Sequence, residues 1–283
     1  MTAPRASTPG LSQPGCRIVL LGRPCDNTSA AANVLNNAGI ALAARIVADP
    51  YSAVAQNPEQ GEGSPVWRAK SPRETRKILE RLRPDLAIAA CYPWRLSHRA
   101  RATVRCGVLN IHPSLLPQGR GPDPVFWVYR NGDRETGVSL HVMDDGLDSG
   151  PILAQRRVPV PEAMDAVTLE RHLFEIGASM TAALLPDVLS GNVVSFPQDE
   201  RAATYQAAPS AQDWIISPLL PAAWAWRFTQ GVAALSGPLV VQSRGTLVPV
   251  RRAIAWGEHG VPPDGLPPGV LSVQFRPGWV LFE

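Results

Sequence analysis

Lysine, cysteine and long apolar runs are scarce in this chain of 283 residues. Lys70 and Lys77 are its only lysines, and its net charge is only +3, whereas nucleic-acid binding needs a concentrated basic face. The four cysteines show no Cys-x-x-Cys spacing, so we expect neither a disulfide framework nor a metal site. No apolar run approaches the ~20 residues that span a bilayer, so we expect no membrane insertion.

The overall composition is that of a globular protein. Hydrophobic residues make up 45% of the chain and charged residues 18%, which is enough apolar material for a sizeable core. Residues 1–14 are rich in proline, serine and threonine and lack the apolar stretch of a signal peptide, so we expect a disordered tail. These features favour a cytoplasmic protein with reduced thiols.

Short apolar runs alternate with helical patterns in the first part of the chain. Residues 17–22, 86–91 and 107–112 have the composition of buried parallel strands,. Ser71 and Pro72 mark the start of a helix, because serine is a good N-cap and proline suits the first helical position. This alternation predicts an α/β fold with a doubly wound, mostly parallel, Rossmann-like sheet.

The pattern changes near residue 200. Two further strands, at 136–143 and 152–160, and a long helix at 168–189 complete the first part,. A possible helix at 222–235 is then followed by short apolar runs at 239–242, 246–250, 253–256, 270–274 and 279–282. Such runs, separated by turn residues, predict a small barrel or open sheet. We therefore expect a main domain over residues 15–200 and a smaller β-rich, barrel-like domain over residues 201–283.

Polar side chains gather where two predicted strands end. Asn110 and His112 are two residues apart at the carboxyl end of a strand, so their side chains share one face, at the edge where such sheets bind ligands. Asp148 lies in the loop after the next strand. If the two strand ends adjoin, its carboxylate reaches the imidazole. His141 alternates along a strand, and we interpret it as a packed or surface histidine.

An amide, an imidazole and a carboxylate together suit the attack of an amine on a carbonyl. Asn110 and protonated His112 can each donate a hydrogen bond to the oxyanion that forms, and one such donor is worth ~3–4 kcal/mol in the transition state. Asp148 can orient the imidazole, favour its charged form and receive the proton of the amine. No serine or cysteine is placed as a nucleophile, so direct transfer is simpler than a covalent intermediate.

Five motifs in a fixed order resemble one family of enzymes. They are Asn110–Pro117, Arg120-Gly121, Gly132-Asp133, Thr136–Val138 and Gly146–Gly150. Together they resemble the 10-formyltetrahydrofolate-dependent formyltransferases, which include the methionyl-tRNA and glycinamide ribonucleotide enzymes. The resemblance covers residues 16–189 and implies a formyltransferase-like fold, a formyl donor (10-formyltetrahydrofolate), and catalytic roles for Asn110, His112 and Asp148 in a catalytic domain.

The resemblance also implies which loops hold the donor and the acceptor. The pterin would lie against Ala90, Cys91, Tyr92, Leu96, Met143, Asp144, Asp145, Gly146 and Leu147. For Asp144 and Asp145 we prefer the interpretation that they form the turn, because Asp-Gly favours turns. The acceptor would lie against Ser114, Leu115, Leu116, Arg120 and Gly121. Arg120 either holds a carboxylate or phosphate of the acceptor or is a solvated loop charge.

The distribution of charge bears on the acceptor. Residues 203–205 and 211–215 resemble the linker into the C-terminal domain of the tRNA formyltransferases, yet residues 201–283 hold only six arginines against four acids. Residues 49–71 hold three acids and two bases where those enzymes carry a basic insertion. Because lysine and arginine contacts with phosphates dominate nucleic-acid affinity, we expect a small-molecule amine, for example a hydroxyornithine-type intermediate of siderophore assembly. Formylation of initiator methionyl-tRNA is the alternative.

Two other functions fit the sequence less well. Donor hydrolases that resemble this chain carry an extra domain before the catalytic one, and only about 15 residues precede the first predicted strand here. A binding module without catalysis would not need Asn110, His112 and Asp148. The sequence does not specify an oligomeric state.

Overall fold

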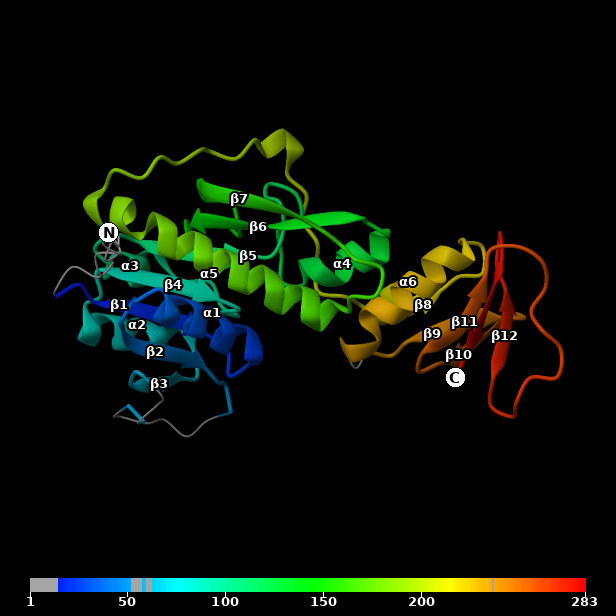
Figure 1. Cartoon of the computed structure of the whole chain (residues 1–283). Coiled ribbons are helices and arrows are strands. Elements are labelled where there is room, and N and C mark those ends of the chain that lie inside the picture. Colours follow the sequence, from blue (N-terminus) through cyan, green and yellow to red (C-terminus); the bar gives the residue numbers. More distant parts are fainter. Residues whose placement is uncertain (1–14, 52–57, 60–62, 236) are drawn as a thin grey trace, which may run out of the picture. The chain divides into compact units, whose positions relative to one another are not determined.

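The computed structural model describes residues 15–51, 58–59, 63–235 and 237–283 (Figure 1). It divides into two compact units. The first contains the described residues up to Gln118, Val138–Arg156 and Arg171–Ala203, and the second contains Gly119–Gly137, Arg157–Glu170 and Thr204–Glu283. The tail predicted at residues 1–14 lies outside the described residues. The first unit ends at Ala203, close to the predicted domain boundary. Two earlier segments, 119–137 and 157–170, nevertheless group with the C-terminal residues. The division into two domains at residue 200 therefore stays a prediction.

A seven-stranded sheet organises the first part of the chain. Its strands are β1 (Ile18–Gly22), β2 (Leu42–Ala48), β3 (Val66–Ala69), β4 (Leu86–Ala90), β5 (Val108–His112), β6 (Glu135–Val142) and β7 (Ile152–Pro159). Their order in the sheet is β3-β2-β1-β4-β5-β6-β7. The pairs β3–β2, β2–β1, β1–β4 and β4–β5 are parallel, whereas β6 is antiparallel to β5. The prediction of an α/β fold with a mostly parallel sheet is confirmed.

Helices α1 (Asp26–Asn37), α2 (Pro72–Leu82) and the short α3 (His98–Arg101) connect the parallel strands. Helix α5 (Ala166–Ser190) and the 3-10 turn η1 (Glu200–Ala202) follow β7. Helix α2 begins as predicted, because the Ser71 side chain accepts a hydrogen bond from the Glu74 amide and Pro72 occupies the first turn,. Gly191 ends α5 with φ 75°, the left-handed conformation that favours glycine.

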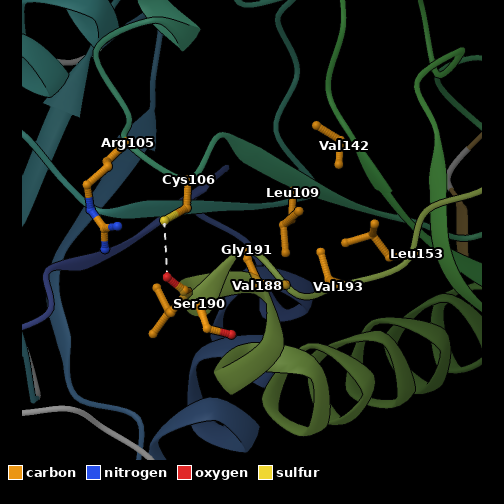
Figure 2. A pocket seen from close by; sticks show the side chains of 10 residues that line it. Arg105, Cys106, Leu109, Val142, Leu153, Val188, Ser190, Gly191 and Val193 are labelled. Atoms are coloured by element: carbon orange, nitrogen blue, oxygen red, sulfur yellow. Dashed lines mark hydrogen bonds between the residues drawn. The ribbon is translucent and has the colours of Figure 1, made fainter.

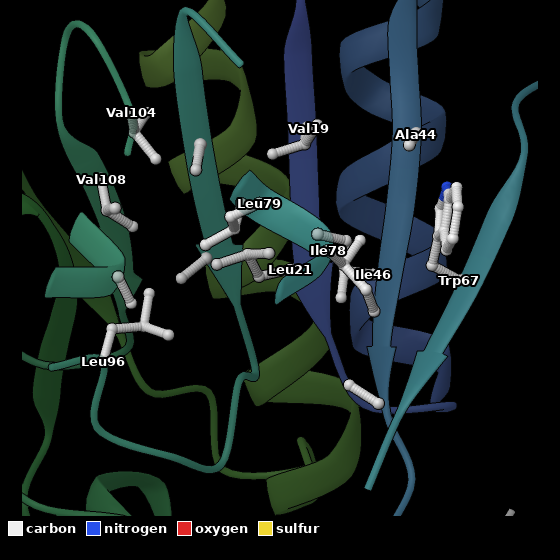
Figure 3. Packing of buried hydrophobic residues seen from close by; sticks show 14 residues of the cluster. Val19, Leu21, Ala44, Ile46, Trp67, Ile78, Leu79, Leu96, Val104 and Val108 are labelled. Atoms are coloured by element: carbon white, nitrogen blue, oxygen red, sulfur yellow. The ribbon is translucent and has the colours of Figure 1, made fainter. Parts of the chain in front are cut away.

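One face of the parallel sheet packs against α2 and α3. Figure 3 shows Val19 and Leu21 of β1 beside Ile78 and Leu79 of α2, and Val108 of β5 belongs to the same buried cluster. Side chains alternate along a strand. Asn110 and His112 therefore project from β5 on the same face as Val108, where this core ends.

Helix α5 packs on the opposite face of β5. A side chain at Gly177 would overlap Cγ2 of Ile111, so glycine permits the close approach of the helix to the strand. By length and composition alone α5 could cross a membrane, which corrects our expectation that no segment of the chain is apolar enough. Leu173, Ala178 and Leu185 are fully buried within the first unit, and this burial accounts for the apolar composition of the helix.

The second unit contains most of the remaining elements. They are α4 (Pro124–Asn131), η2 (Ala211–Trp214), β8 (Ile215–Ile216), α6 (Ala222–Val232), η3 (Ala233–Leu235), β9 (Val240–Ser243), β10 (Thr246–Pro249), β11 (Ala253–Gly257), β12 (Leu271–Gln274) and β13 (Trp279–Phe282). The strands form two three-stranded sheets, β10-β9-β8 and β11-β13-β12. The predicted β-rich C-terminal part is confirmed, with each of the five predicted short strands present.

Aromatic packing explains why α4 groups with the C-terminal elements. The ring of Phe126 in α4 lies 4.9 Å from Trp214 and 5.8 Å from Phe228. Trp224 stacks on Phe228 at 5.1 Å, and its indole N–H donates to the carbonyl oxygen of Arg130 at 3.0 Å. Trp214 and Trp224 are therefore packing residues of this unit.

The contact of Gly177 with Ile111 gives a test of how α5 sits on the sheet. We expect Gly177→Ala to lower the free energy of unfolding by about 1–3 kcal/mol, because the added methyl group overpacks the interface. Urea unfolding followed by circular dichroism measures this loss. Ser179→Ala on the exposed side of the same helix is the control and should change stability by less than about 0.5 kcal/mol. A Gly177→Ala variant as stable as the original chain would contradict the close packing.

Candidate active site

Two of the predicted catalytic residues lie on β5, at the end of the buried core. Asn110 and His112 are 9% and 5% exposed, and their strand is parallel to β4 on one side and antiparallel to β6 on the other. Buried polar groups require hydrogen-bonding partners. Strand pairing places Asn110 opposite His141 and His112 opposite Ser139, so β6 supplies neighbouring polar groups.

The path of the chain to Asp148 differs from the one we expected. Because β6 is antiparallel to β5, the carboxyl ends of the two strands lie at opposite ends of the pair and do not adjoin, so the premise of our sequence argument was wrong. The loop after β6 instead turns back, with the Val142 amide donating to the Pro151 carbonyl oxygen at 3.0 Å. This turn returns Asp148 to the level of Asn110.

The returning loop is held in an unusual backbone conformation. Asp148 has φ 51°, a left-handed value that is uncommon for residues other than glycine. The side-chain amide of Gln198 donates to the carbonyl oxygens of both Asp148 and Gly150, each at 2.8 Å. Gln198 therefore fixes the backbone that carries the carboxylate, a contribution that no motif in the sequence indicated.

The three predicted side chains converge. The Asn110 amide nitrogen lies 3.4 Å from Oδ1 of Asp148, and Nδ1 of His112 lies 3.8 Å from Oδ2 of the same carboxylate. The second distance is that of an ion pair when the imidazole is protonated, and it is longer than an ordinary hydrogen bond. One buried carboxylate thus lies between an amide donor and an imidazole.

His141 is a fourth member of this cluster, and its side chain is 1% exposed. Its Nε2 lies 3.0 Å from the Asn110 amide nitrogen, and its Nδ1 lies 3.2 Å from the Val142 carbonyl oxygen. A carbonyl only accepts, so Nδ1 carries the proton and Nε2 accepts from Asn110. Packing was expected for this histidine, but its bond to Asn110 was not. This bond follows from the register of β6 against β5, which pairs His141 with Asn110. The sequence alone does not reveal that register.

The two loops assigned to the pterin meet in the structure. Ala90 ends β4, and the side chains of Tyr92, Leu96 and Met143 contact the same apolar cluster. The Tyr92 hydroxyl donates to Thr75 Oγ1 at 2.8 Å, and burial raises the pKa of this phenol, so it stays protonated. Side chains of both loops therefore contact the same apolar cluster, and the Tyr92 ring among them is uncharged.

Ionic contacts also join these two loops. Arg101 donates to Oδ1 of Asp145 at 2.6 Å, which holds the pKa of that carboxyl below its usual value, and Arg95 donates to the Asp145 carbonyl oxygen. Asp144 accepts from the Gly146 amide at 3.0 Å and from the Ser149 hydroxyl at 2.8 Å. Asp144 is thus a turn former, as the Asp-Gly sequence allows, whereas Asp145 links the loops. Gly146 and Leu147 are exposed beside them.

The residues assigned to the acceptor divide between the two units. Ser114, Leu115 and Leu116 follow β5 in the first unit, whereas Arg120 and Gly121 belong to the second. The Ser114 hydroxyl donates to the Gln118 carbonyl oxygen at 2.8 Å, and the Leu116 amide donates to Ser139 Oγ at 3.0 Å. These bonds shape the loop itself.

Arg120 is not a solvated charge. It is 8% exposed, and its backbone bridges to Tyr205 within the second unit. A side chain at Gly121 would overlap the Gln206 carbonyl oxygen, so the glycine allows this close passage of two backbones. The interpretation of Arg120 as a solvated loop charge is therefore wrong.

A cavity of 430 Å³ lies elsewhere on the first unit. Figure 2 shows Leu109, Val142 and Leu153 lining it together with Cys106 and the end of α5. Leu109 precedes Asn110 in β5, and adjacent residues of a strand point to opposite faces. This cavity is therefore distinct from the cluster around Asp148.

Comparisons with known proteins agree with this geometry. A family model described as formyl transferase matches residues 30–185. The methionyl-tRNA formyltransferase of Roseiflexus castenholzii is 36% identical over 205 residues, which are 72% of this chain and 66% of that protein. The enzyme of the same name from Roseiflexus sp. is 39% identical over 170 residues, which are 59% of this chain and 52% of that protein. The chain thus spans between half and two thirds of the length of these curated relatives.

Solved structures share the fold. HypX from Aquifex aeolicus, in complex with tetrahydrofolic acid, superposes with a TM-score of 0.68 at 19% identity over 94% of this chain and 43% of that protein. WlaRD, a sugar 3N-formyl transferase, gives a TM-score of 0.65 at 13% identity over 94% of this chain and 96% of that protein. The family model covers more than half of the sequence, and this chain belongs to the formyl transferase family.

Proposed function

We propose that this chain transfers a formyl group from 10-formyltetrahydrofolate to the nitrogen of an amine. The observation that carries the proposal is the convergence of Asn110 and His112 on the carboxylate of Asp148. Such a site has hydrogen-bond donors for an oxyanion and an acceptor for a proton. Family membership supplies the reaction class, and the geometry supplies a role for each side chain.

The reaction is direct attack of the amine on the formyl carbon. A bond forms between the amine nitrogen and that carbon, and the oxygen becomes an oxyanion that protonated His112 and Asn110 stabilise by donating hydrogen bonds. Asp148 takes the proton of the amine, directly or through a water. The bond from carbon to N10 of the folate then breaks, and N10 receives a proton, which leaves tetrahydrofolate and the formamide.

The contacts of Asn110 suggest how the oxyanion gains its donor. Both hydrogens of its amide have partners in the structure: His141 Nε2 at 3.0 Å and Asp148 Oδ1 at 3.4 Å. The longer bond is the weaker one. In our proposal the oxyanion replaces Asp148 as the second partner, while His141 keeps the amide oriented.

The donor loops fit a flat, partly apolar heterocycle. Tyr92 and Trp94 contact edge to face with ring centroids 5.8 Å apart, and both pack, as Met143 does, against the buried cluster below β1, β4 and β5. Arg101 ties the other loop in place through Asp145. We propose that residues 90–96 and 143–147 bind the pterin of the donor.

For the acceptor, the named relatives support the alternative over our first expectation. The curated relatives quoted above are methionyl-tRNA formyltransferases, and we propose initiator methionyl-tRNA as the acceptor. The charge of the chain supports the small amine that we first expected, because Arg201 and Arg252 pair with Asp199 and Glu283. These pairs lower the number of arginine side chains that can contact phosphates.

The catalytic assignment predicts large effects on turnover. We expect Asn110→Ala and His112→Ala each to lower kcat by about 10²–10³-fold, because each removes a donor to the oxyanion. The KM for the donor should change little, because the lost interaction forms only in the transition state. Steady-state assays with varied 10-formyltetrahydrofolate measure both quantities. His172→Ala, on the exposed side of α5, is the matched control; unchanged kcat in both site variants would refute the assignment.

His141 should act as a positioning residue. We expect His141→Ala to lower kcat while His141→Asn, which can still accept a hydrogen bond from Asn110, retains more of it. Both variants should keep the circular dichroism spectrum of the original, whereas the unfolding midpoint of His141→Ala should fall because a buried side chain is lost. If the alanine and asparagine variants lose the same activity, the bond from Asn110 to His141 has no part in orienting the amide.

The acceptor can be identified by direct competition. Initiator methionyl-tRNA, an amino-sugar nucleotide and hydroxyornithine are supplied together with one donor, and the formylated products are separated by mass spectrometry. We expect methionyl-tRNA to give the highest kcat/KM, with a fall at higher salt that reflects its phosphate contacts. Preference for either small amine, with no salt-dependent binding of tRNA, would restore our first expectation.

A further inference from the structure

Two cysteines meet at the end of the sheet that carries the donor loop. Cys25 follows β1 and is the N-cap of α1, and Cys91 follows β4. Strands β1 and β4 are direct neighbours, so the two residues lie at the carboxyl ends of adjacent strands. The Cys25 sulfur lies 3.5 Å from the Thr28 hydroxyl, which donates to the carbonyl oxygen of Ala90, the residue before Cys91, although the two cysteines are 66 positions apart in the sequence.

The backbones around this pair are tightly joined. Gly22 at the end of β1 passes so close to β4 that an added Cβ would lie 2.7 Å from the Ala90 carbonyl oxygen. The Thr28 hydroxyl donates to the same oxygen at 3.1 Å. Cys91 itself has φ 58°, a left-handed value that is uncommon in a residue with a side chain. The fold thus holds the two sulfur atoms near each other through rigid elements on both sides.

The surroundings of Cys25 favour the thiolate, which is the reactive form of cysteine. The hydrogen bond from Cys91, together with one from Thr28, lowers the pKa of the Cys25 thiol to about 5, although burial opposes the shift. The positive end of the α1 macrodipole acts in the same direction. Both cysteines are only half-buried, so a small oxidant can reach them.

The other two cysteines provide an internal comparison. Cys16 and Cys106 are also half-buried and lie near enough to interact electrostatically, but burial and the neighbouring Asp85 raise the pKa of the Cys16 thiol. A thiol of raised pKa is a poor nucleophile at neutral pH. The same chain therefore holds one thiol whose pKa is lowered, at Cys25, and one whose pKa is raised, at Cys16.

We propose that Cys25 and Cys91 form a peroxide-sensitive dithiol that closes to a disulfide beside the donor loop. The Cys25 thiolate attacks the O–O bond of hydrogen peroxide, giving a sulfenic acid and hydroxide. The Cys91 thiol then attacks that sulfur, a water leaves, and a Cys25–Cys91 disulfide remains. In sum, two thiols lose two electrons and two protons, and one peroxide becomes two waters.

Formation of this disulfide would change the backbone conformation at Cys91, which lies within residues 90–96, the segment that we assigned to the pterin. This consequence rests on the proposed function, whereas formation of the disulfide does not. Oxidation should therefore lower binding of the formyl donor, and a dithiol reductant should restore it.

Peptide mapping tests the chemistry without any enzyme assay. Folded full-length protein is treated with hydrogen peroxide, its remaining thiols are blocked, and the digest is searched by mass spectrometry. We expect a Cys25–Cys91 linked peptide that dithiothreitol removes, in the original chain and in a Cys16→Ser/Cys106→Ser control. Oxidation of Cys25 without linkage to Cys91, or linkage of Cys16 to Cys106 at the same rate, would overturn the proposal.

The pH dependence of alkylation gives a second readout. Iodoacetamide labelling of Cys25 should reach half of its maximal rate near pH 5 in the original chain. In Cys91→Ala, which has no hydrogen-bond donor at this position, it should shift toward the value of about 8.5 typical of a free thiol if the hydrogen bond from Cys91 is responsible. An unchanged profile in Cys91→Ala would show that Cys91 does not activate Cys25.

Activity separates the regulatory claim from the chemical one. Formyl transfer by the original chain should be lost after peroxide and recovered with dithiothreitol, whereas Cys25→Ser, which removes the attacking thiolate outside the residues assigned to the donor, should not show this reversible loss. Linkage with unchanged formyl transfer would refute the effect on the donor loop. If the chain transfers no formyl group at all, the linked peptide still decides whether the dithiol exists.

Discussion

The antiparallel pairing of β6 with β5 is the constraint on which the candidate site depends. It places His141 directly opposite Asn110, and it forces the following loop to turn back before Asp148 can approach the strand. Gln198 then fixes the returned loop through two backbone carbonyls. A parallel strand at this position would carry its loop past the end of β5, and the buried amide would lose both of its partners. The antiparallel strand β6 therefore determines which side chains lie next to Asn110.

Most of the sheet could be predicted because its signals are local. Uninterrupted apolar runs define β1 and β4, and the Ser71–Pro72 pair defines the start of α2. Helix α4 gave no such signal, because its eight residues place Phe126 and Trp127 side by side and show no clear period. Its conformation depends on aromatic packing with Trp214 and Phe228, residues about a hundred positions later in the chain, and local patterns do not encode such contacts.

For the site, residue identities could be predicted but their connections could not. Asn110, His112 and Asp148 are recognisable from their motifs, and the structure brings them together. The bonds that orient them come from His141 and Gln198, which belong to no motif, because a register and a returning loop are properties of the tertiary fold. Arg120 is a different case. The sequence left open an acceptor contact or a solvated charge, and the structure excludes only the second, because Arg120 is buried and its backbone bridges to Tyr205.

The strand order brings separate chemical functions to one edge of the sheet. Strands β1, β4 and β5 are consecutive neighbours, and ligands of α/β proteins bind outside the carboxyl ends of such strands. Cys25 follows the first, the proposed donor loop follows the second, and His112 ends the third. A covalent change between the first two strands therefore occurs next to the loop on which donor binding would depend. Redox sensitivity at this position would need no separate domain, because the edge that we propose to bind the donor also holds the two thiols.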